Sequence, residues 1–188
     1  MMTQPHLLDS RRCLVLIIDI QTRLAAAMPE NDAAVMTANV CKLLQAAEIF
    51  NVPVLLTEQY PQGLGPTMAD ICRHLPADVR IFSKTSFSCC GAENFNQVLL
   101  SSKCRQVILC GQEAHVCVLQ TAIDLIQLGL QVYVVEDAVC SRRPEHKHNA
   151  MQRMSRQGVT PVCLESVLFE WLKDAKHADF KAVSALVR

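Results

Sequence analysis

The chain contains several apolar runs without polar alternation, and helical spacing follows each of them. The clearest run is Cys13 to Ile18, which ends at Asp19. A strand with one solvated face alternates apolar and polar residues, so an unbroken run indicates a strand that is covered on both faces, as in a parallel sheet. Residues 32–50 then carry apolar side chains at helical spacing, and the next run begins at Val52.

This alternation occurs six times with short connections. Strands are expected over 13–18, 52–57, 79–84, 105–110, 130–136 and 159–162. Helices are expected over 32–50, 67–75, 92–102, 116–128, 144–157, 164–174 and 179–187. Pro144 suits the first position of its helix, and Gly129 suits the position after a helix end. The pattern predicts an α/β protein with an open parallel sheet, in a single domain spanning 1–188.

Composition limits the classes of partner. The 188 residues are 51% hydrophobic and carry a formal net charge of zero, which gives no electrostatic reason to bind nucleic acid or an anionic membrane. No apolar run approaches the roughly 20 residues of a spanning helix, and Met1 to His6 lacks the basic start of a secretory signal. We therefore expect a soluble protein of the cytoplasm, with the mitochondrion as the alternative, and no nucleic-acid or membrane partner.

The ten cysteines are expected to be reduced thiols. No C-x-x-C spacing occurs, so neither a zinc ribbon nor a thioredoxin-type pair is supported. The adjacent pair Cys89 and Cys90 is interpreted as packing. Six cysteines lie within or beside apolar stretches, where the side chain behaves as a small hydrophobe: Cys13, Cys41, Cys104, Cys110, Cys117 and Cys163.

Three residues that can perform chemistry fall at or just past the ends of three expected strands: Asp19, Lys84 and Cys117. Ligands bind outside the carboxyl ends of the strands in such sheets. Each residue alone has an ordinary explanation. Asp19 could pair with Arg23, Lys84 could be a solvated loop lysine, and Cys117 could be a small residue at a helix–sheet contact. Their joint placement favours a catalytic site.

Cys117 is expected on the first turn of the helix after Gly111, where negative charge is favoured and a thiol ionises more easily. Lowering the pKa of a thiol from about 8.5 to about 6 requires roughly 3.4 kcal/mol. A helix N-terminus supplies about 0.3–1 kcal/mol, whereas an ammonium about 4 Å away offers on the order of 4 kcal/mol. Lys84 is therefore expected to stabilise the thiolate, and Asp19 to accept the proton and return it.

Three segments together resemble the isochorismatase-like cysteine hydrolases: Leu16–Gln21, Ser83–Phe87 and Gly111–Thr121. Thr57–Thr67 is similar to the branch of isochorismatase-domain-containing proteins, and the resemblance extends over nearly the whole chain. It implies a six-stranded parallel sheet in the order 3-2-1-4-5-6 with helices on both faces, a Rossmann-like three-layer sandwich. It also implies a homo-oligomer, either a dimer or a larger assembly.

The resemblance further implies a triad of Cys117, Asp19 and Lys84. It implies a cis peptide bond between Gln112 and Glu113, and an oxyanion hole made by the N–H groups of Glu113 and Cys117. In this superfamily, nicotinamidases carry a metal-binding Asp-x-His-x-His after the second strand. Residues 58–62 of this chain read Glu-Gln-Tyr-Pro-Gln instead.

No catalytic metal and no cofactor are therefore expected. The remaining close histidine pair, His146 and His148, points to different faces of its helix, which favours solvent-exposed side chains. Nuclease activity is disfavoured by the neutral charge and the missing metal ligands. A dinucleotide-binding domain is disfavoured because no G-x-G-x-x-G follows the first strand.

Four residues flank the triad in sequence and are candidates to bind a substrate: Gln21, Tyr60, Phe87 and His115. Tyr60 and Phe87 could equally be core or interface aromatics. This small, mostly apolar set suggests a compact uncharged substrate, an amide or a related acyl compound. The resulting hypothesis is a metal-independent cysteine hydrolase. The alternative is a catalytically idle protein with an interaction or regulatory role.

Overall fold

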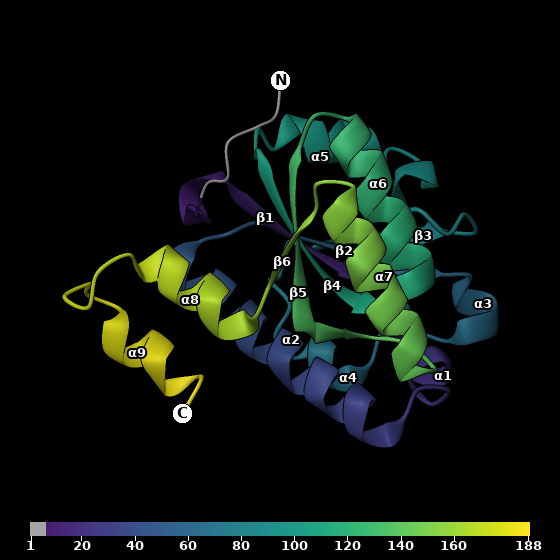
Figure 1. Ribbon diagram of the computed structural model, residues 1–188, viewed down its shortest axis with the longest axis horizontal. Coiled ribbons are helices and arrows are strands. Elements are labelled where there is room, and N and C mark those ends of the chain that lie inside the picture. The colour runs from purple at the N-terminus through teal and green to yellow at the C-terminus, as the bar shows by residue number, and fades with distance from the viewer. Residues whose placement is uncertain (1–6) are drawn as a thin grey trace.

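The computed structural model describes residues 7–188. Residues 1–6, on which the expectation about a secretory signal rests, lie outside this range. All six strands lie in one sheet, paired in parallel in the order β3-β2-β1-β4-β5-β6, which confirms the predicted fold class and strand order (Figure 1). The strands are β1 (Cys13–Ile18), β2 (Val54–Gln59), β3 (Arg80–Lys84), β4 (Gln106–Gln112), β5 (Gln131–Cys140) and β6 (Thr160–Val162).

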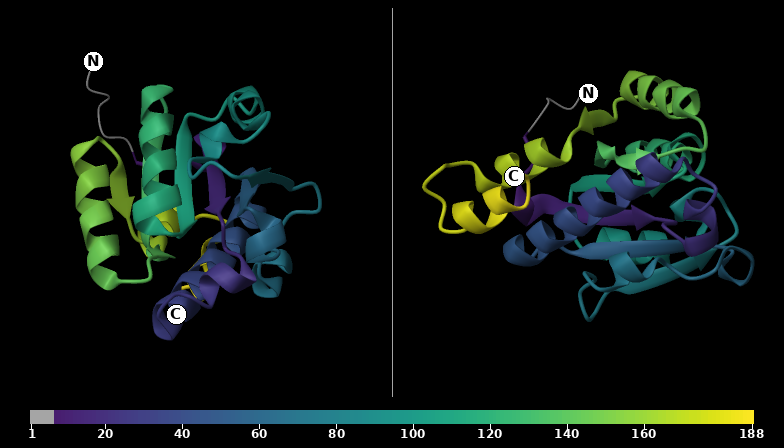
Figure 2. Two further views of the ribbon diagram at one scale, coloured as in Figure 1. Left: turned by 90° about the vertical axis from the view of Figure 1, so that its right-hand side faces the viewer. Right: turned by 90° about the horizontal axis from the view of Figure 1, so that it is seen from below.

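Helices cover both faces of this sheet and create two hydrophobic cores (Figure 2). Successive side chains of a strand point to opposite faces, so Val15 and Ile17 enter one core while Leu14 and Leu16 enter the other. The first core is closed by α2 (Glu30–Phe50), α4 (Ala69–Cys72), α8 (Leu164–Leu172) and α9 (Phe180–Ala185). The second is closed by α5 (Phe95–Ser101), α6 (Leu119–Gln127) and α7 (Pro144–Arg156). Two short helices, α1 (Thr22–Ala25) and α3 (Pro61–Leu64), follow β1 and β2.

Helix α2 has the length and composition of a membrane-spanning helix. Its apolar side chains have another explanation in this fold, because Val40, Leu43, Leu44 and Ala47 are buried against the sheet. Helix α8 also packs on the sheet. Five of its apolar residues are buried in the same core as α2: Leu164, Val167, Leu168, Trp171 and Leu172.

Three strands end later than the apolar pattern predicts: β2, which ends at Gln59, and the neighbouring strands β4 and β5. β4 continues to Gln112 and β5 continues to Cys140, and these two residues pair at the end of the ladder. The extension depends on backbone pairing, which polar side chains such as Gln112 do not interrupt. The register between the two strands shifts between Leu109 and Gly111.

Gly111 allows β1 and β4 to approach closely just before the strands end. Its φ of 116° lies in the region that favours glycine, and a Cβ at this position would collide with the carbonyl oxygen of Ile18. The close approach brings the chain after β4 next to the chain after β1.

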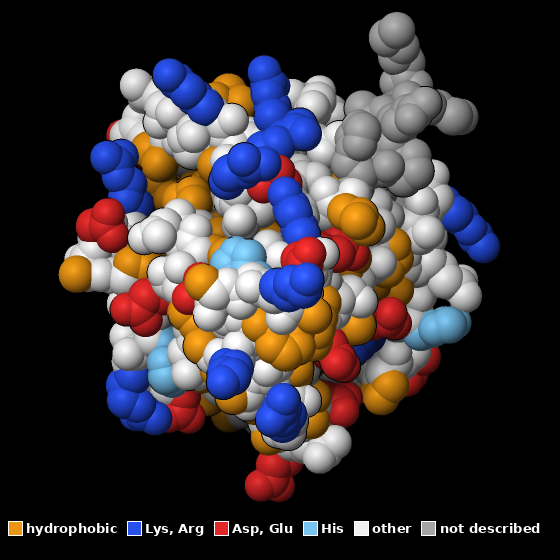
Figure 3. Space-filling view, turned by 90° about the vertical axis from the view of Figure 1, so that its left-hand side faces the viewer, with side chains coloured by type: hydrophobic (Ala, Val, Ile, Leu, Met, Phe, Trp, Pro, Cys, Tyr) orange, Lys and Arg blue, Asp and Glu red, His pale blue; other side chains and the backbone are white. Residues whose placement is uncertain are grey.

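Charged side chains of both signs cover the side of the molecule shown in Figure 3. Lys and Arg are more frequent toward the upper edge of that view, and Asp and Glu are interspersed among them. On this side the surface therefore presents no broad field of one sign, consistent with the formal net charge of zero.

Candidate active site

Asp19, Lys84 and Cys117 come together at the carboxyl edge of the sheet. Asp19 directly follows β1, Lys84 ends β3, and Cys117 lies in a turn after β4. Lys84 Nζ lies 2.7 Å from Asp19 Oδ2, and both side chains are fully buried. The Asp19 carboxylate and the Lys84 ammonium both lie close enough to the buried Cys117 thiol to act on its pKa. The structure thus brings together the three residues that the strand ends predicted.

Lys84 is held by four oxygen atoms. Besides Asp19, its ammonium donates to Gln59 Oε1 at 2.6 Å and to the carbonyl oxygens of Phe87 at 3.0 Å and Ser86 at 3.3 Å. An ammonium has three protons, so these bonds use its whole donor capacity. The alternative of a solvated loop lysine is therefore wrong.

Asp19 is fixed through both its backbone and its carboxylate. Its φ of 54° places it in the left-handed region, which aspartate tolerates better than most residues. Its N–H donates to the Thr57 carbonyl at 3.1 Å, and its own carbonyl accepts from the Gln112 side-chain amide at 3.2 Å. Oδ1 accepts a 2.7 Å bond from the Thr57 hydroxyl, while Oδ2 faces Lys84. Both carboxylate oxygens are thereby held in place.

The expectation that Cys117 ionises easily is wrong for this structure. Burial raises the pKa of the Cys117 thiol well above its ordinary range, the charge of Asp19 raises it further, and Lys84 opposes the shift. Only 4% of the residue is exposed, so the thiolate would lose most of its hydration. These effects together favour the neutral thiol over the thiolate in this structure.

The turn that carries Cys117 is a single π-helical turn, Ala114–Val118, which precedes α6. The Gln112–Glu113 peptide bond before it is cis. The Glu113 carbonyl accepts from the N–H groups of Val116 at 3.0 Å and Val118 at 3.2 Å. The predicted helix over 116–128 therefore begins with a wider turn, because the bond from Val118 spans five residues rather than four.

Glu113 is also anchored through its side chain. Its carboxylate accepts from the Arg142 backbone N–H at 3.0 Å and from Arg142 Nε at 3.1 Å. These bonds tie the chain before the π-helical turn to the residues that follow β5. The N–H of Glu113 thus belongs to a fixed backbone segment next to the thiol.

The four predicted substrate-binding residues have different environments. Gln21 is buried, and its amide pairs with the backbone of Gln59, accepting from N–H at 2.7 Å and donating to the carbonyl at 3.0 Å. It also donates to the Gly65 carbonyl at 2.7 Å. Its polar atoms are thus engaged in holding the loop after β2, which favours a structural role.

Tyr60 and Phe87 are aromatic side chains at the surface, 54% and 53% exposed. The Tyr60 N–H donates to the Lys84 carbonyl at 2.8 Å, and the Phe87 carbonyl accepts from Lys84 Nζ. Both residues therefore border the triad through their backbones, and their rings are available to a ligand or a partner.

His115 contacts both the end of β5 and α7. Its Nδ1 lies 3.0 Å from the Ser141 hydroxyl, and its ring centroid lies 4.7 Å from that of His146. Burial lowers the pKa of His115, with His146 and Arg142 acting in the same direction and Glu113 opposing them. The interpretation that both His146 and His148 are solvent-exposed is wrong for His146, which is half-buried, whereas His148 is exposed.

Residues 58–62, the segment compared above with the metal-binding motif of nicotinamidases, hold the loop after β2 in place. Glu58 Oε1 accepts from both the N–H and the hydroxyl of Thr67 at 2.7 Å, and Gln59 binds Lys84. Within residues 7–188, no group of three or more His, Cys, Asp or Glu side chains is placed to hold a metal ion.

Four residues of the site were missed by the sequence reasoning: Thr57, Gln59, Cys89 and Gln112. Thr57 and Gln59 follow an apolar run that ends at Leu56, and they are two positions apart, so they share one face of the strand. Two polar side chains on one face of a strand, beside the ends that carry Asp19 and Lys84, are a signal that could have identified them.

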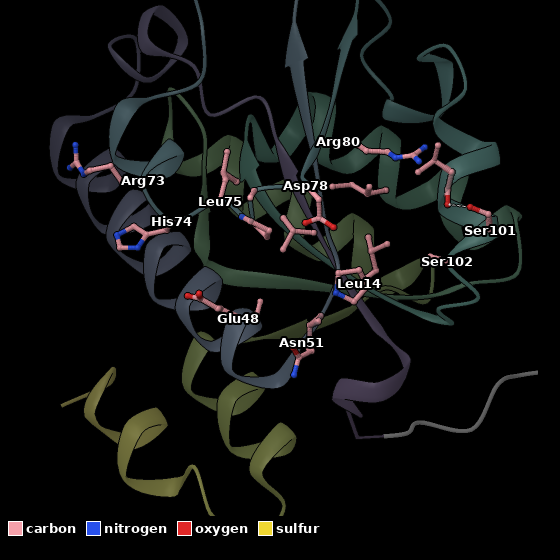
Figure 4. Close-up of a pocket in the computed structure, with 18 residues that line it drawn as sticks. Leu14, Glu48, Asn51, Arg73, His74, Leu75, Asp78, Arg80, Ser101 and Ser102 are labelled. Atoms are coloured by element: carbon pink, nitrogen blue, oxygen red, sulfur yellow. Dashed lines mark hydrogen bonds between the residues drawn. The ribbon is translucent and has the colours of Figure 1, made fainter.

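The cavity shown in Figure 4 belongs to the opposite edge of the sheet. It has a volume of about 730 Å³ and is lined by residues near the starts of three strands, including Leu14, Val54 and Arg80. None of the triad residues lines it. Parallel strands place their starts and ends at opposite edges, so this cavity is separate from the candidate active site.

Residues 13–166 match the isochorismatase domain family. Isochorismatase domain-containing protein 2 of Danio rerio is 36% identical over 180 residues, which covers 96% of this chain and 89% of the relative. The structure of the MAR1 ribonuclease from Caenorhabditis elegans is 34% identical with a TM-score of 0.90, covering 96% of this chain and 91% of that one.

YcaC proteins are also similar in structure. The protein from Pseudomonas aeruginosa, determined with hexane-2,5-diol and covalent acrylamide, is 25% identical with a TM-score of 0.88, and covers 96% of this chain and 89% of that one. The protein from Escherichia coli, described as an octameric hydrolase of unknown specificity, is 26% identical with a TM-score of 0.88, and covers 98% of this chain and 91% of that one.

Proposed function

The chain belongs to the isochorismatase family, and from this premise we propose that it is a metal-independent hydrolase of a small amide or related acyl compound, with Cys117 as the nucleophile. The observation that carries the proposal is the buried Asp19–Lys84 pair, 2.7 Å apart, with both charges close enough to the buried Cys117 thiol to act on its pKa. A buried ion pair of this kind keeps a base ionised beside a thiol that is itself neutral.

In the first half of the proposed reaction, Cys117 Sγ attacks the acyl carbon while its proton passes to Asp19. The carbonyl π bond opens, and the resulting oxyanion is stabilised by the N–H groups of Glu113 and Cys117. The intermediate collapses when the bond to the leaving nitrogen or oxygen breaks. The leaving group takes the proton from Asp19, and a thioester remains on Cys117.

Water completes the cycle. Asp19 accepts a proton from the attacking water, whose oxygen bonds to the thioester carbon. The carbon–sulfur bond then breaks, the acid leaves, and the proton returns to sulfur. Lys84 keeps Asp19 ionised at the start of each half-reaction and maintains its position.

Labelling of Cys117 by acrylamide tests the nucleophile before a substrate is known. A YcaC relative carries covalent acrylamide, a compound that adds to nucleophilic thiols. Burial and a raised pKa would by themselves slow Cys117, but in the proposed mechanism Asp19 accepts its proton as the sulfur attacks. We therefore expect Cys117 to be modified faster than the exposed thiols of Cys72 and Cys163 in peptide mapping by mass spectrometry. Slower modification of Cys117 than of these two thiols would contradict the proposal.

A panel of small amides and acyl compounds should then be screened with the wild type, Cys117→Ala and the control Cys72→Ala. Any turnover should be lost in Cys117→Ala, which lacks the nucleophile, and kept in Cys72→Ala. Turnover that persists in Cys117→Ala would remove the thiol from the mechanism. A slow thiol together with no turnover would instead favour the alternative of an idle, interacting protein.

RNA cleavage is a second candidate activity, because the relative from Caenorhabditis elegans is named a ribonuclease. Incubating a radiolabelled RNA with the wild type and Cys117→Ala, at low and at high salt, separates the two proposals. Cleavage that disappears at high salt would indicate phosphate contacts. The formal net charge of zero favours the small acyl substrate.

We also propose a homo-oligomer, a dimer or larger. The YcaC protein from Escherichia coli is an octamer, and several large apolar side chains of this chain are exposed, including Ile81, Phe87 and Leu100. Analytical ultracentrifugation at micromolar concentration tests this, and a single species with the 20.9 kDa mass of one chain would contradict it.

A further inference from the structure

We propose that Thr57 is a positioning residue, which keeps Asp19 ionised and aimed at Cys117 through a buried chain of hydrogen bonds that ends at the Cys89 thiol. The inference rests on the proposed function, since it assigns a task to residues around the same carboxylate.

The position of β2 in the sheet makes this role available. β2 lies between β1 and β3, so it separates the strand that leads to Asp19 from the strand that ends at Lys84. Thr57 pairs with Ile18, next to Asp19, and Gln59 pairs with Lys84. Thr57 and Gln59 are two positions apart and face the same way, so one contacts the carboxylate and the other the ammonium.

The direction of each hydrogen bond follows from the number of protons. The Thr57 hydroxyl donates its one proton to Asp19 Oδ1 at 2.7 Å. Cys89 Sγ lies 3.6 Å from the same hydroxyl oxygen, so the thiol must be the donor in that contact. Burial raises the pKa of Cys89 to about 12, which keeps its proton in place at neutral pH.

Cys89 is itself held in position. Its N–H donates to the Thr121 hydroxyl at 3.0 Å, which connects it to α6, and none of Thr57, Cys89 and Thr121 is exposed. Thr57 therefore cannot turn its hydroxyl toward water, and its proton is committed to Asp19.

The ionisable groups that face Asp19 come from three elements. They are Lys84 at the end of β3, Cys117 in the π-helical turn, and Cys89 in the turn Cys89–Gly91. Lys84 is the one cation among these three, and Thr57 adds the neutral donor to the other carboxylate oxygen. Removing that donor leaves Oδ1 buried without its partner, which disfavours the ionised form.

The test compares Thr57→Val with Thr57→Ser, with Thr37→Val as the matched control. Thr37 is also buried, but its hydroxyl bonds to the Ala33 carbonyl within α2. The rate of acrylamide addition to Cys117 is followed by peptide mass spectrometry between pH 5 and pH 9. A hydrogen bond to a charged group shifts the midpoint of that group's titration by about one pH unit or more. In Thr57→Val the acidic side of the curve of labelling rate against pH should therefore move to higher pH by about that amount.

Thr57→Ser should restore the profile, and Thr37→Val should leave it unchanged. A purely structural role predicts lower stability without a shift in the pH profile. An unshifted profile in folded Thr57→Val, or a Thr57→Ser profile that stays shifted, would overturn the inference.

A second measurement does not depend on the reactivity of Cys117. The carboxyl ¹³C signal of Asp19, identified by its loss in Asp19→Asn, is titrated in the wild type and in Thr57→Val. The midpoint should move to higher pH in Thr57→Val, and an unmoved midpoint would overturn the inference. If the ¹³C midpoint moves while wild-type Cys117 stays unreactive, the positioning role holds and the proposed hydrolase function fails.

Discussion

At the scale of single residues, the site depends on charges that are buried with their partners. Taking a carboxylate or an ammonium out of water costs several kcal/mol per ion, so such groups persist only when they attract each other and are fully hydrogen-bonded. Asp19 and Lys84 meet both conditions, because both side chains are unexposed and Lys84 binds three further oxygens. The arrangement allows a carboxylate to remain buried close to a buried thiol.

Replacing Lys84 with Met tests this balance. The variant leaves Asp19 as an uncompensated buried charge, so the free energy of unfolding in urea should fall by about 3–5 kcal/mol. Because Lys84 opposes the rise in the pKa of Cys117, the pKa of this thiol should rise further, and labelling of Cys117 at neutral pH should slow. Lys176→Met, at an exposed lysine, is the control. Equal stability and equal labelling in the two variants would argue against the buried pair.

The catalytic candidates were predictable from sequence because they follow strand ends, which apolar runs reveal. Asp19 follows an unbroken apolar run, whereas Lys84 ends a segment in which apolar and polar residues alternate. The ionisation of Cys117 was not predictable, since it depends on how deeply the sulfur is buried and on which charges meet there. Thr57 and Cys89 were missed for a related reason, because their contact joins residues 32 positions apart in sequence.

At the scale of elements, the unbroken apolar runs specified the parallel strands, whereas their ends depended on backbone pairing. β4 and β5 extend past their apolar runs because Gly111 and Gln112 pair with Val139 and Cys140. The π-helical turn at Ala114–Val118 left no mark in the hydrophobic pattern, since its wider turn is set by which N–H groups reach the Glu113 carbonyl.

Gly111→Ala tests how closely β1 and β4 must approach. The new Cβ would meet the Ile18 carbonyl oxygen, and the φ of 116° disfavours a side chain. Gly129→Ala is the matched control, because it also has a positive φ but its Cβ would meet nothing within 4 Å. We expect the control to lose about 1–2 kcal/mol in urea unfolding, and Gly111→Ala to lose clearly more or to fail to fold. Similar losses would mean that the approach of the strands is not tight.

At the scale of the whole molecule, the two cores on either side of the sheet explain the abundance of cysteine. Four thiols are almost unexposed: Cys13, Cys89, Cys110 and Cys140. They occupy places that would suit small apolar residues, which confirms the packing interpretation for Cys13, Cys89 and Cys110. The same interpretation is wrong for Cys163, which is exposed. Burial raises the pKa of each of these four thiols to about 12.

These buried thiols make the free energy of unfolding depend on pH. The direction of this dependence follows from the number of protons that the folded and the unfolded chain bind. An unfolded thiol loses its proton near its ordinary pKa of about 8.5, whereas the folded protein holds the proton to much higher pH. Above pH 9 the unfolded chain therefore binds fewer protons, and each buried thiol lowers stability by about 1.4 kcal/mol per pH unit. The buried Tyr133, whose pKa is also raised by burial, acts in the same direction at higher pH.

Urea unfolding with a reductant should thus give a midpoint that is flat between pH 7 and pH 8 and falls steeply from pH 9 to pH 10.5. Cys110→Ala removes one fully buried thiol and should reduce this loss by about 1–2 kcal/mol, although the variant is less stable at pH 7 because of its smaller side chain. Cys163→Ala, at an exposed thiol, should keep the wild-type slope. The expected difference in slope between Cys110→Ala and the wild type arises because the folded wild type retains the proton of the buried thiol. Curves of urea midpoint against pH that run parallel for all three proteins would show that the buried thiols do not control stability at alkaline pH.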